Sequence, residues 1–525
     1  MTEVHLTGTS YLKDIFARNA SRELFFDVRL DQSTTYGELY DQSRRTASVL
    51  RSLGVNRGDA TAVSVENGVE AAWLYFGCMH LGARFVPINP ALHAGDILAI
   101  LKLSGASAML TTPKIRERFS DGQLPVPVHC FAQAAERLKD RHRQLLTMDL
   151  RAEIAARDPF SESELADFPD ETVFMTMYSS GTTGLPKGVN ISYKGILNNG
   201  RVFAEALGLN NESRFYNVLP MTYLGGAYNL MLIPILAEGS IVLDGVFGVP
   251  NVYGFWETVR DRNVNTLWFS PTMLSMLLRL EDEMDMSFLH SQVRCGIVGM
   301  APLSPELKQR FEERFGVPLY ENYGLSETTF LTTQRPGRPR LAGSVGTCLK
   351  GVEIRLLDPA HQPAPPTREG NIAIRTEYFM RGYSNDENSS SFLPEGWFLT
   401  GDRGLFDDAG ELHITGRTKD IIIRGGINVS PKRIEDVLYE LPAVSEAAVV
   451  GIPDEVYGEE IVAAVVLNPS GEDPLDEETI LEHCKSRIAH FQTPKRVFVF
   501  EALPRGATGK LQKTMIRQNV LERMK

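Results

Sequence analysis

Between about residue 10 and residue 330, short runs of β-branched or aromatic residues alternate with longer amphipathic stretches. Residues 60–65 predict a strand, and residues 68–81 predict the helix that follows it. Residues 85–88 predict another short strand, which precedes a helical stretch at residues 94–103. A repeated strand–helix–strand order is typical of α/β layers with largely parallel sheets. We therefore expect this part of the chain to form layered α/β subdomains.

The pattern changes near residue 340, where the segments become short and rich in turns. Residues 353–357 and 371–375 predict two strands, and the loop between them carries four prolines. Prolines at this density indicate turns rather than a long linker. We expect residues 340–415 to form a small antiparallel or barrel-like β subdomain.

The last part of the chain, from about residue 420, has the pattern of a separate small unit. Ser430 and Pro431 predict a helix start, because a capping hydroxyl is followed by the residue suited to the first helical position. Asp476 predicts a second helix start. Strands are expected at residues 446–452, 461–467 and 496–500, before a basic C-terminal helix. About 105 residues of this kind can fold as an α+β domain of their own.

The charge balance and the cysteines limit the classes of function. The 525 residues include 54 Lys and Arg against 66 Asp and Glu, a formal net charge of −12, so we expect no nucleic-acid partner. The five cysteines form no CxxC pair and no zinc-ligand spacing with histidine, which favours a reducing, cytoplasmic compartment. The N-terminus lacks an apolar signal segment, and no run of about 18 apolar residues predicts a membrane span.

The segment at residues 178–188 carries the most specific chemistry, with four Ser or Thr hydroxyls, three glycines and one lysine. Glycines let backbone amides approach an anion, hydroxyls donate hydrogen bonds and the lysine supplies charge, so we favour a phosphate-binding loop over a surface turn. The Walker A spacing is absent, and residues 189–192 predict a strand after the loop. The candidate phosphate-binding residues are Ser179, Ser180, Gly181, Thr182, Thr183, Gly184 and Lys187.

This loop resembles the phosphate loop of the adenylate-forming superfamily, which includes acyl- and aryl-CoA synthetases, peptide-synthetase adenylation domains and beetle luciferases. Later segments resemble the family's other motifs, in the family's order and across most of the chain. These segments are residues 299–303, 320–327, 343–346, 400–402, 416–420, 424–428 and 504–510. The resemblance implies a fold of class α/β, with a large N-terminal domain at residues 1–418 and a small mobile C-terminal domain at residues 419–525.

The resemblance also implies ATP, Mg²⁺ and a thiol acceptor, for which CoA is preferred. Glu327 then binds Mg²⁺, which prefers hard oxygen ligands, and Ser326 donates to the α-phosphate. Lys510 bridges the substrate carboxylate and the α-phosphate, where a compact ammonium suits a charge spread over several oxygens. A solvent-exposed acid and one more lysine of a basic tail are the structural alternatives for Glu327 and Lys510.

Further residues take nucleotide-binding or hinge roles by the same resemblance. Asp402 follows a turn in which a carboxylate can accept bonds from the ribose hydroxyls, and Arg417 brings a cation to the ribose or the phosphates. Tyr323 offers a flat face for adenine. The other residues expected beside the nucleotide are Gly299, Met300, Ala301, Pro302, Glu321, Asn322 and Gly324. Those expected at the hinge and the thiol tunnel are Lys419, Asp420, Gly425 and Gly426.

The stretch from residue 219 resembles the family's segment beside the acyl group. Tyr223 stands where many members have His, Gly225 and Gly226 leave room, and Asn229 offers a polar contact. Because no acidic residue is present there to bind an amino group, we expect a fatty, branched or aromatic acid without an α-amino group. The arginines at positions 335, 338 and 340 could meet a CoA phosphate, although a solvated loop is the favoured interpretation.

The leading hypothesis is a two-step ligase that forms acyl-AMP and pyrophosphate and then a thioester with CoA. The alternatives are an enzyme that passes the acyl group to a carrier protein and one that uses the adenylate for lactone or diazo formation. A nucleotide sensor without turnover is disfavoured, because Lys187, Glu327, Asp402, Arg417 and Lys510 are all present. A homodimer stays open as the assembly.

Overall fold

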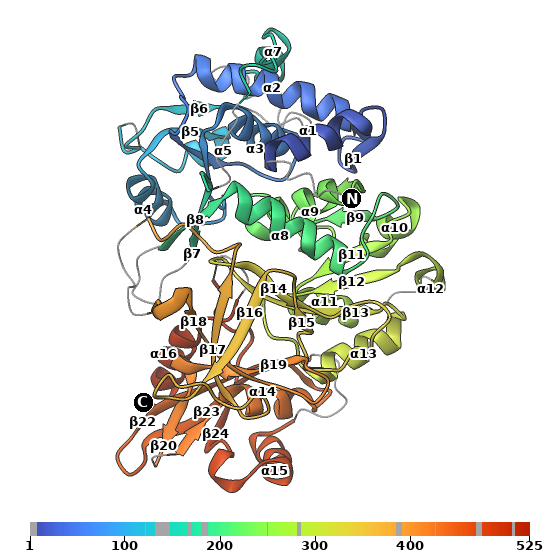
Figure 1. Ribbon diagram of the computed structural model, residues 1–525. Coiled ribbons are helices and arrows are strands. Elements are labelled where there is room, and N and C mark those ends of the chain that lie inside the picture. Colours follow the sequence, from blue (N-terminus) through green and yellow to red (C-terminus); the bar gives the residue numbers. More distant parts are fainter. Residues whose placement is uncertain are drawn as a thin grey trace.

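The computed structural model is shown in Figure 1, with the N-terminal part in blue and the C-terminal part in red at the opposite end. It describes residues 8–120, 122–131, 148–165, 171–179, 187–248, 250–280, 285–384, 391–425, 427–468, 475–506 and 510–524. Among these residues, none of the helices combines the length and the apolar character that a membrane crossing needs.

The first sheet has six strands in the order β6-β5-β3-β4-β7-β8. All neighbours are parallel except β7 and β8, which are antiparallel. The strands are β3 (Ala60–Ser64), β4 (Arg84–Pro87), β5 (Ala106–Thr111), β6 (Val128–Cys130), β7 (Val173–Ser179) and β8 (Lys187–Ser192). Helices α3 (Val69–Leu81) and α4 (Ala94–Ser104) connect β3 to β4 and β4 to β5. The predicted α/β order is therefore confirmed, and the glycine-rich segment joins two strands as expected.

The second sheet has nine strands in the order β15-β14-β13-β12-β11-β9-β10-β1-β2. The six strands from β13 to β1 in that order are parallel, whereas β2, β14 and β15 are antiparallel additions. The bounds are β1 (Glu23–Asp27), β2 (Gln32–Thr35), β9 (Arg214–Asn217), β10 (Ser240–Leu243), β11 (Thr266–Phe269), β12 (Cys295–Val298), β13 (Leu319–Leu325), β14 (Thr329–Thr333) and β15 (Thr347–Cys348). Ligands of open α/β sheets bind beyond the carboxyl ends of such strands, where residues 299–303 and 326–327 follow β12 and β13.

The helices around these sheets begin at recognisable signals. Ser270 and Ser304 each accept a bond from the backbone N–H three residues on, and each precedes a proline at the first helical position. The bounds are α1 (Gly8–Arg18), α2 (Tyr36–Ser52), α5 (Pro113–Arg116), α7 (Leu150–Ala155), α8 (Tyr193–Ala206), α9 (Ile233–Leu236), α10 (Phe255–Asp261), α11 (Pro271–Arg279), α12 (Phe288–Gln292) and α13 (Pro305–Phe315). A π-helix, Gly225–Leu232, precedes α9.

The third sheet is the small β unit expected after residue 340, and its antiparallel form is confirmed. The described strands pair in an open row, β16-β17-β18-β19. The bounds are β16 (Val352–Leu357), β17 (Gly370–Thr376), β18 (Phe398–Phe406) and β19 (Leu412–Arg417). The short 3₁₀ turn Pro394–Gly396 precedes β18, and another, Thr418–Asp420, follows β19.

The fourth sheet belongs to the last part of the chain and has the order β21-β20-β23-β22, with β24 beside β23. Its strands are β20 (Ile422–Arg424), β21 (Ile427–Val429), β22 (Val444–Asp454), β23 (Gly458–Leu467) and β24 (Arg496–Val499). Helices α14 (Pro431–Tyr439), α15 (Glu477–Arg487) and α16 (Lys513–Arg523) accompany it, with the 3₁₀ turn His490–Gln492. Two apolar clusters within this unit are separate from the large core, so the expected α+β unit has its own interior.

The structure corrects one prediction about the start of α14. The helix begins at Pro431 as expected, but Ser430 makes no capping bond. Its hydroxyl donates instead to the backbone oxygen of Thr415 in β19, at 2.5 Å. The hydroxyl predicted to cap the helix therefore donates to a carbonyl of the third sheet instead. Asp476 does cap α15 and accepts from the N–H of Thr479 at 2.8 Å.

We predict that Gly226→Ala destabilises the fold around the π-helix. An added Cβ would lie 2.4 Å from the backbone oxygen of Leu219 and from two backbone atoms of Pro220, where no flexible side chain can yield. The free energy of unfolding should fall by about 1–3 kcal/mol, the usual cost of overpacking. Gly254→Ala is the control, since nothing lies within 4 Å of its added Cβ. Equal urea midpoints for the two variants would contradict the prediction.

Candidate active site

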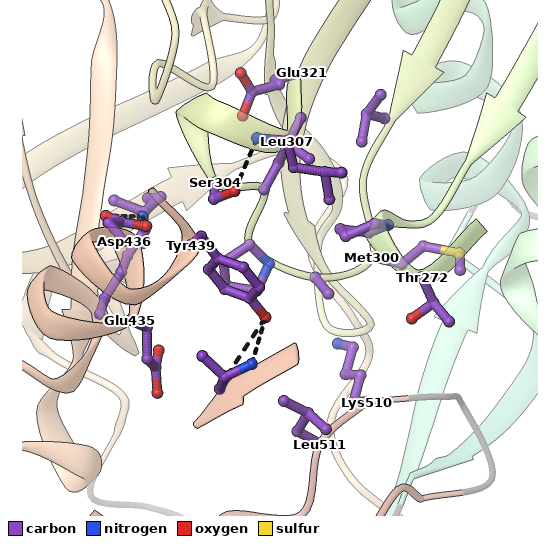
Figure 2. A pocket seen from close by; sticks show the side chains of 18 of the residues that line it. Thr272, Met300, Ser304, Leu307, Glu321, Glu435, Asp436, Tyr439, Lys510 and Leu511 are labelled. Carbon is purple, nitrogen blue, oxygen red and sulfur yellow. Dashed lines mark hydrogen bonds and ion pairs between the residues drawn. The ribbon is translucent and has the colours of Figure 1, made fainter. Parts of the chain in front are cut away.

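A cavity of about 370 Å³ lies between the carboxyl ends of β11, β12 and β13 and the C-terminal unit. Figure 2 shows Met300 and Thr272 on one wall and Tyr439 with Glu435 on another, and Lys510 points into the space between them. The cavity brings together predicted residues that lie up to about two hundred positions apart in the chain. Those that line it are Met300, Ala301, Pro302, Glu321, Asn322, Tyr323, Gly324, Asp402, Arg417, Asp420 and Lys510.

The buried carboxylate of Asp402 organises one side of the cavity. Residues 402 and 417 are register partners of the antiparallel strands β18 and β19, which places their side chains together. The Nε of Arg417 donates to Oδ1 of Asp402 at 2.9 Å, and the hydroxyl of Tyr323 donates to Oδ2 at 2.6 Å. Loss of water around the hydroxyl and the neighbouring Asp402 both raise the pKa of Tyr323, so it stays a donor at neutral pH.

The ammonium of Lys510 is solvent-accessible through the cavity, but protein atoms surround it closely. This desolvation lowers the pKa of Lys510, and the positive charge of Arg417 lowers it further. Asp402 and Glu327 act in the opposite direction. The C-terminal unit therefore brings its lysine within electrostatic reach of two carboxylates and a guanidinium of the larger part.

Glu327 follows β13 and is held by a residue that sequence reasoning missed. The hydroxyl of Tyr383 donates to Oε1 of Glu327 at 2.9 Å, across 56 positions of sequence. The backbone oxygen of Glu327 also accepts from the N–H of Met380 at 2.7 Å. Lys187 lies on the other side of Tyr383, with its Nζ 4.7 Å from the ring centroid. A single tyrosine outside the regular strands and helices carries no periodic signal, so only the fold reveals this contact.

The phosphate loop itself lies largely outside the described residues. This applies to Ser180, Gly181, Thr182, Thr183 and Gly184, to the side chain of Ser179, and to Gly426 of the expected thiol tunnel. Lys187, at the start of β8, is described and stands beside Tyr383. The phosphate-binding roles of Lys187 and of the other loop residues therefore stay predictions.

The residues expected around the acyl group occupy the π-helix and the turn before it. Asn217 supports the helix by donating from Nδ2 to the backbone oxygens of Gly226 and Leu230, at 3.1 and 3.2 Å. A Cβ at Gly225 would lie 3.3 Å from the sulfur of Met300, which lines the cavity. Asn229 is buried, and none of these helix residues lines the cavity itself.

Tyr223 lies in the turn before the π-helix, near Ser326 and Glu327. Burial raises the pKa of Tyr223, the side chain of Ser326 lowers it and the charge of Glu327 raises it. Neither Tyr223 nor Ser326 lines the 370 Å³ cavity. The position expected to differ from the family's His therefore lies near the two residues predicted to serve the metal and the α-phosphate.

The segment expected beside adenine is supported by a buried polar network. Lys308 on α13 donates from Nζ to Oε1 of Glu321 at 3.1 Å and to Oε1 of Gln334 at 2.9 Å. Burial raises the pKa of Glu321, and Lys308 opposes that change. Gly299 lets the chain pass Asn322, because a Cβ there would lie 2.5 Å from its Oδ1. Sequence reasoning missed Lys308, which looks like one of several charged residues on a solvated helix.

Two of the three arginines after residue 334 have local partners. Arg340 pairs with Glu312 at 3.3 Å, and an Nη of Arg335 donates to the backbone oxygen of Cys348 at 2.8 Å. These contacts fit the structural interpretation of that loop.

Lys419 and Asp420 lie in the 3₁₀ turn between the third and fourth sheets. Desolvation and Arg417 lower the pKa of Lys419.

Metal binding has to rely on few protein ligands. Within the described part of the chain, no three His, Cys, Asp or Glu side chains gather in a way that could hold a metal ion. Mg²⁺ is commonly held by one or two carboxylates, with water and substrate phosphates as its remaining ligands. The half-buried carboxylate of Glu327, with one oxygen fixed by Tyr383, fits this mode of binding.

The chain belongs to the AMP-binding enzyme family. That family's model matches residues 13–384, and the model of the AMP-binding enzyme C-terminal domain matches residues 433–510. The chain is 31% identical to sulfoacetate–CoA ligase of Cupriavidus necator over 492 residues, 91% of both chains. It is also 31% identical to oxalate–CoA ligase of Arabidopsis thaliana over 503 residues, 93% of this chain and 94% of that protein.

A solved structure supports the same assignment. ATP-bound MatB from Rhodopseudomonas palustris superposes with a TM-score of 0.89 at 25% sequence identity. The match covers 99% of this chain and 100% of that chain. Membership of the adenylate-forming superfamily, expected from the motifs, is therefore confirmed.

The lowered pKa of Lys510 predicts the pH dependence of adenylation. As pH rises, Lys510 should lose its proton below the 10.5 of an ordinary lysine, and charge stabilisation of the transition state should go with it. Pyrophosphate release should therefore fall on an alkaline limb with an apparent pKa under 10.5. Thioester formation from supplied acyl-AMP should lack that limb, because its thiol only gains reactivity with pH. A limb shared by both half-reactions would overturn the assignment.

Two substitutions at Tyr223 should separate its hydroxyl from its bulk. Tyr223→Phe removes the hydroxyl, whose pKa Ser326 and Glu327 influence, and should slow adenylation about two- to tenfold, with the order of preferred acids unchanged. Tyr223→Ala also opens space and should shift preference toward bulkier acids. Pyrophosphate release with straight-chain and aryl acids of increasing size measures both effects. An unaltered acid profile in Tyr223→Ala would place the residue outside the pocket.

Proposed function

We propose that this chain is an AMP-forming acid–CoA ligase. In the first step a carboxylate oxygen attacks the α-phosphorus of ATP, and pyrophosphate leaves with the electrons of the broken bond. In the second step the thiolate of CoA attacks the acyl carbon, and AMP leaves. The observation that carries the proposal is the 370 Å³ cavity, which is lined together by Lys510 of the C-terminal unit, Asp402, Arg417 and the segment after β12.

The roles of the residues follow from their positions. Asp402 has two hydrogen bonds in place, and a carboxylate has about four acceptor sites, so capacity is left for the ribose hydroxyls. The ring of Tyr323 is fixed through its hydroxyl, which leaves a face for adenine. Lys510 is a mobile point charge that can serve both the incoming carboxylate and the α-phosphate. Positioning and charge neutralisation of this kind dominate phosphoryl-type transfer.

Mg²⁺ is the proposed metal, and Glu327 the residue of this chain that would hold it. A bound Mg²⁺ supplies charge neutralisation on the phosphate oxygens. The second carboxylate oxygen of Glu327 is the group available for this, since Tyr383 occupies the first. Ser326, beside it, would donate to the α-phosphate.

The boundary between the domains is proposed at residues 418 and 419. Support comes from the sheets: β19 ends at Arg417 in the third sheet, and β20 begins at Ile422 in the fourth. The turn between them would absorb the rotation that brings the loop around Gly425 to the cavity for the thiol step. Gly425 has φ +57°, a backbone conformation that favours glycine.

For the acid we propose a molecule without an α-amino group. Residues 219–232 contain no carboxylate that could bind an ammonium. The named relatives are ligases for sulfoacetate and oxalate, and neither of these acids has an α-amino group. CoA is the proposed acceptor. Transfer of the acyl group to a carrier protein is the second candidate. We also propose a cytoplasmic location and a homodimeric assembly.

A panel of acids tests the proposal. Pyrophosphate release should require one class among fatty, aryl and amino acids, hydroxylamine should trap the adenylate, and CoA should convert it to a thioester. Lys510→Ala should slow adenylate formation by about 10²- to 10³-fold, as loss of one preorganised charge partner does, and spare thioester formation from supplied acyl-AMP.

Lys495→Ala is the matched control for that variant. It removes an exposed lysine of the same unit that pairs with Asp454 at 3.4 Å. Its adenylation rate should equal that of the parent protein. Equal loss of both half-reactions in Lys510→Ala, or no pyrophosphate with any acid, would refute the proposed reaction.

A further inference from the structure

Tyr383 touches both an acid and a base of the proposed phosphate site. Its hydroxyl donates to Oε1 of Glu327 at 2.9 Å, and its ring face lies 4.7 Å from Nζ of Lys187. The aromatic quadrupole attracts a cation to the ring face, while the hydroxyl at the ring edge serves a carboxylate. One side chain therefore fixes two groups of opposite charge without neutralising either of them.

The backbone around Tyr383 is itself held against both groups. Residue 383 forms an isolated antiparallel bridge with Val189 of β8. The N–H of Asn190 donates to the oxygen of Gly382 at 3.1 Å, and the N–H of Ser384 donates to the oxygen of Gly188 at 2.8 Å. These bonds join the segment to the strand that begins with Lys187. Three positions before Tyr383, the Met380 N–H reaches the backbone of Glu327.

Tyr383 is also suited to remain a hydrogen-bond donor. It is half-buried, and a tyrosine hydroxyl keeps its proton at neutral pH. A carboxylate that keeps one oxygen in a fixed bond loses rotational freedom, so its other oxygen keeps one direction. That is the condition for binding a metal ion that demands near-ideal geometry.

We propose that Tyr383 is a positioning residue that sets the direction of the Glu327 carboxylate for Mg²⁺ through its hydroxyl and the place of the Lys187 ammonium through its ring. The inference rests on the proposed role of Glu327 in metal binding. Tyr383 acts through these two residues and makes no contact with the reacting atoms of its own.

The test measures binding of a non-cleavable ATP analogue, α,β-methylene ATP, by calorimetry with saturating Mg²⁺ and with EDTA. The gain in affinity from Mg²⁺ should fall about five- to tenfold in Tyr383→Phe, while affinity in EDTA stays unchanged. Tyr383→Leu should also lose about two- to fivefold in EDTA, because Lys187 loses its ring contact.

Tyr378→Phe is the matched control. Tyr378 lies five positions before Tyr383, and its hydroxyl donates to the backbone oxygen of Lys350 at 2.8 Å instead of to Glu327. It should bind the analogue as the parent protein does under both conditions. Thermal unfolding of each variant shows whether the fold is retained, and Tyr383→Phe keeps the packed ring. Equal losses in Tyr378→Phe and Tyr383→Phe would reduce Tyr383 to a structural role and overturn the inference.

Glu327→Gln separates this inference from the proposed metal role. If Glu327→Gln keeps the full gain from Mg²⁺, the metal role of Glu327 fails, and the inference fails with it. If Mg²⁺ no longer raises the affinity of Glu327→Gln for the analogue but still raises that of Tyr383→Phe in full, only the inference about Tyr383 fails. The double variant should lose no more of the gain than Glu327→Gln alone, because the hydroxyl acts through that carboxylate.

Discussion

The constraint behind this site is electrostatic: a carboxylate has to approach a phosphorus that negative oxygens already surround. In the proposed roles three cations serve this phosphorus, and two of them already have partners that hold them in place. Arg417 is bound to Asp402 at 2.9 Å, and Lys187 lies over the ring of Tyr383. A cation that a partner holds in place needs little reorganisation when charge develops. The third, Lys510, belongs to the C-terminal unit, so in the proposed mechanism it contributes only when that unit is in position.

The fold brings these groups together by joining strand ends from different sheets. Parallel strands β12 and β13 deliver Met300 and Glu327 at one edge of the second sheet. The antiparallel pair β18 and β19 places Asp402 beside Arg417, and β8 of the first sheet begins at Lys187. No single sheet could provide all of them, because neighbouring strand ends offer only a few side chains each. Of these residues, Met300, Asp402 and Arg417 line the 370 Å³ cavity.

The sequence predicted the parts of this arrangement that depend on neighbours along the chain. Strand and helix order, the loop between β7 and β8 and the residues after β12 follow from periodicity and motifs. The partners that hold the site could not be predicted: Lys308 for Glu321 and Tyr383 for Glu327. They are common residue types whose partners lie 13 and 56 positions away, and only the folded chain brings them close. The prediction that Ser430 caps α14 was wrong for the same reason, because its hydroxyl bonds to the carbonyl of Thr415, which lies 15 positions away in the sequence.

The boundary between the larger part and the C-terminal unit, where the cavity lies, differs in its contacts from the apolar interiors of the two parts. The larger part and the C-terminal unit each bury their own apolar clusters, and the apolar residues of those clusters end at Leu412 and resume at Ile422. The polar contacts across this boundary include the bond from Ser430 to Thr415 and the charge of Lys432 near Glu321. Water can replace such hydrogen bonds when the two surfaces separate. The rotation proposed for the C-terminal unit would leave the separate apolar clusters intact. It would also free the hydroxyl of Ser430 from Thr415 to cap the start of α14.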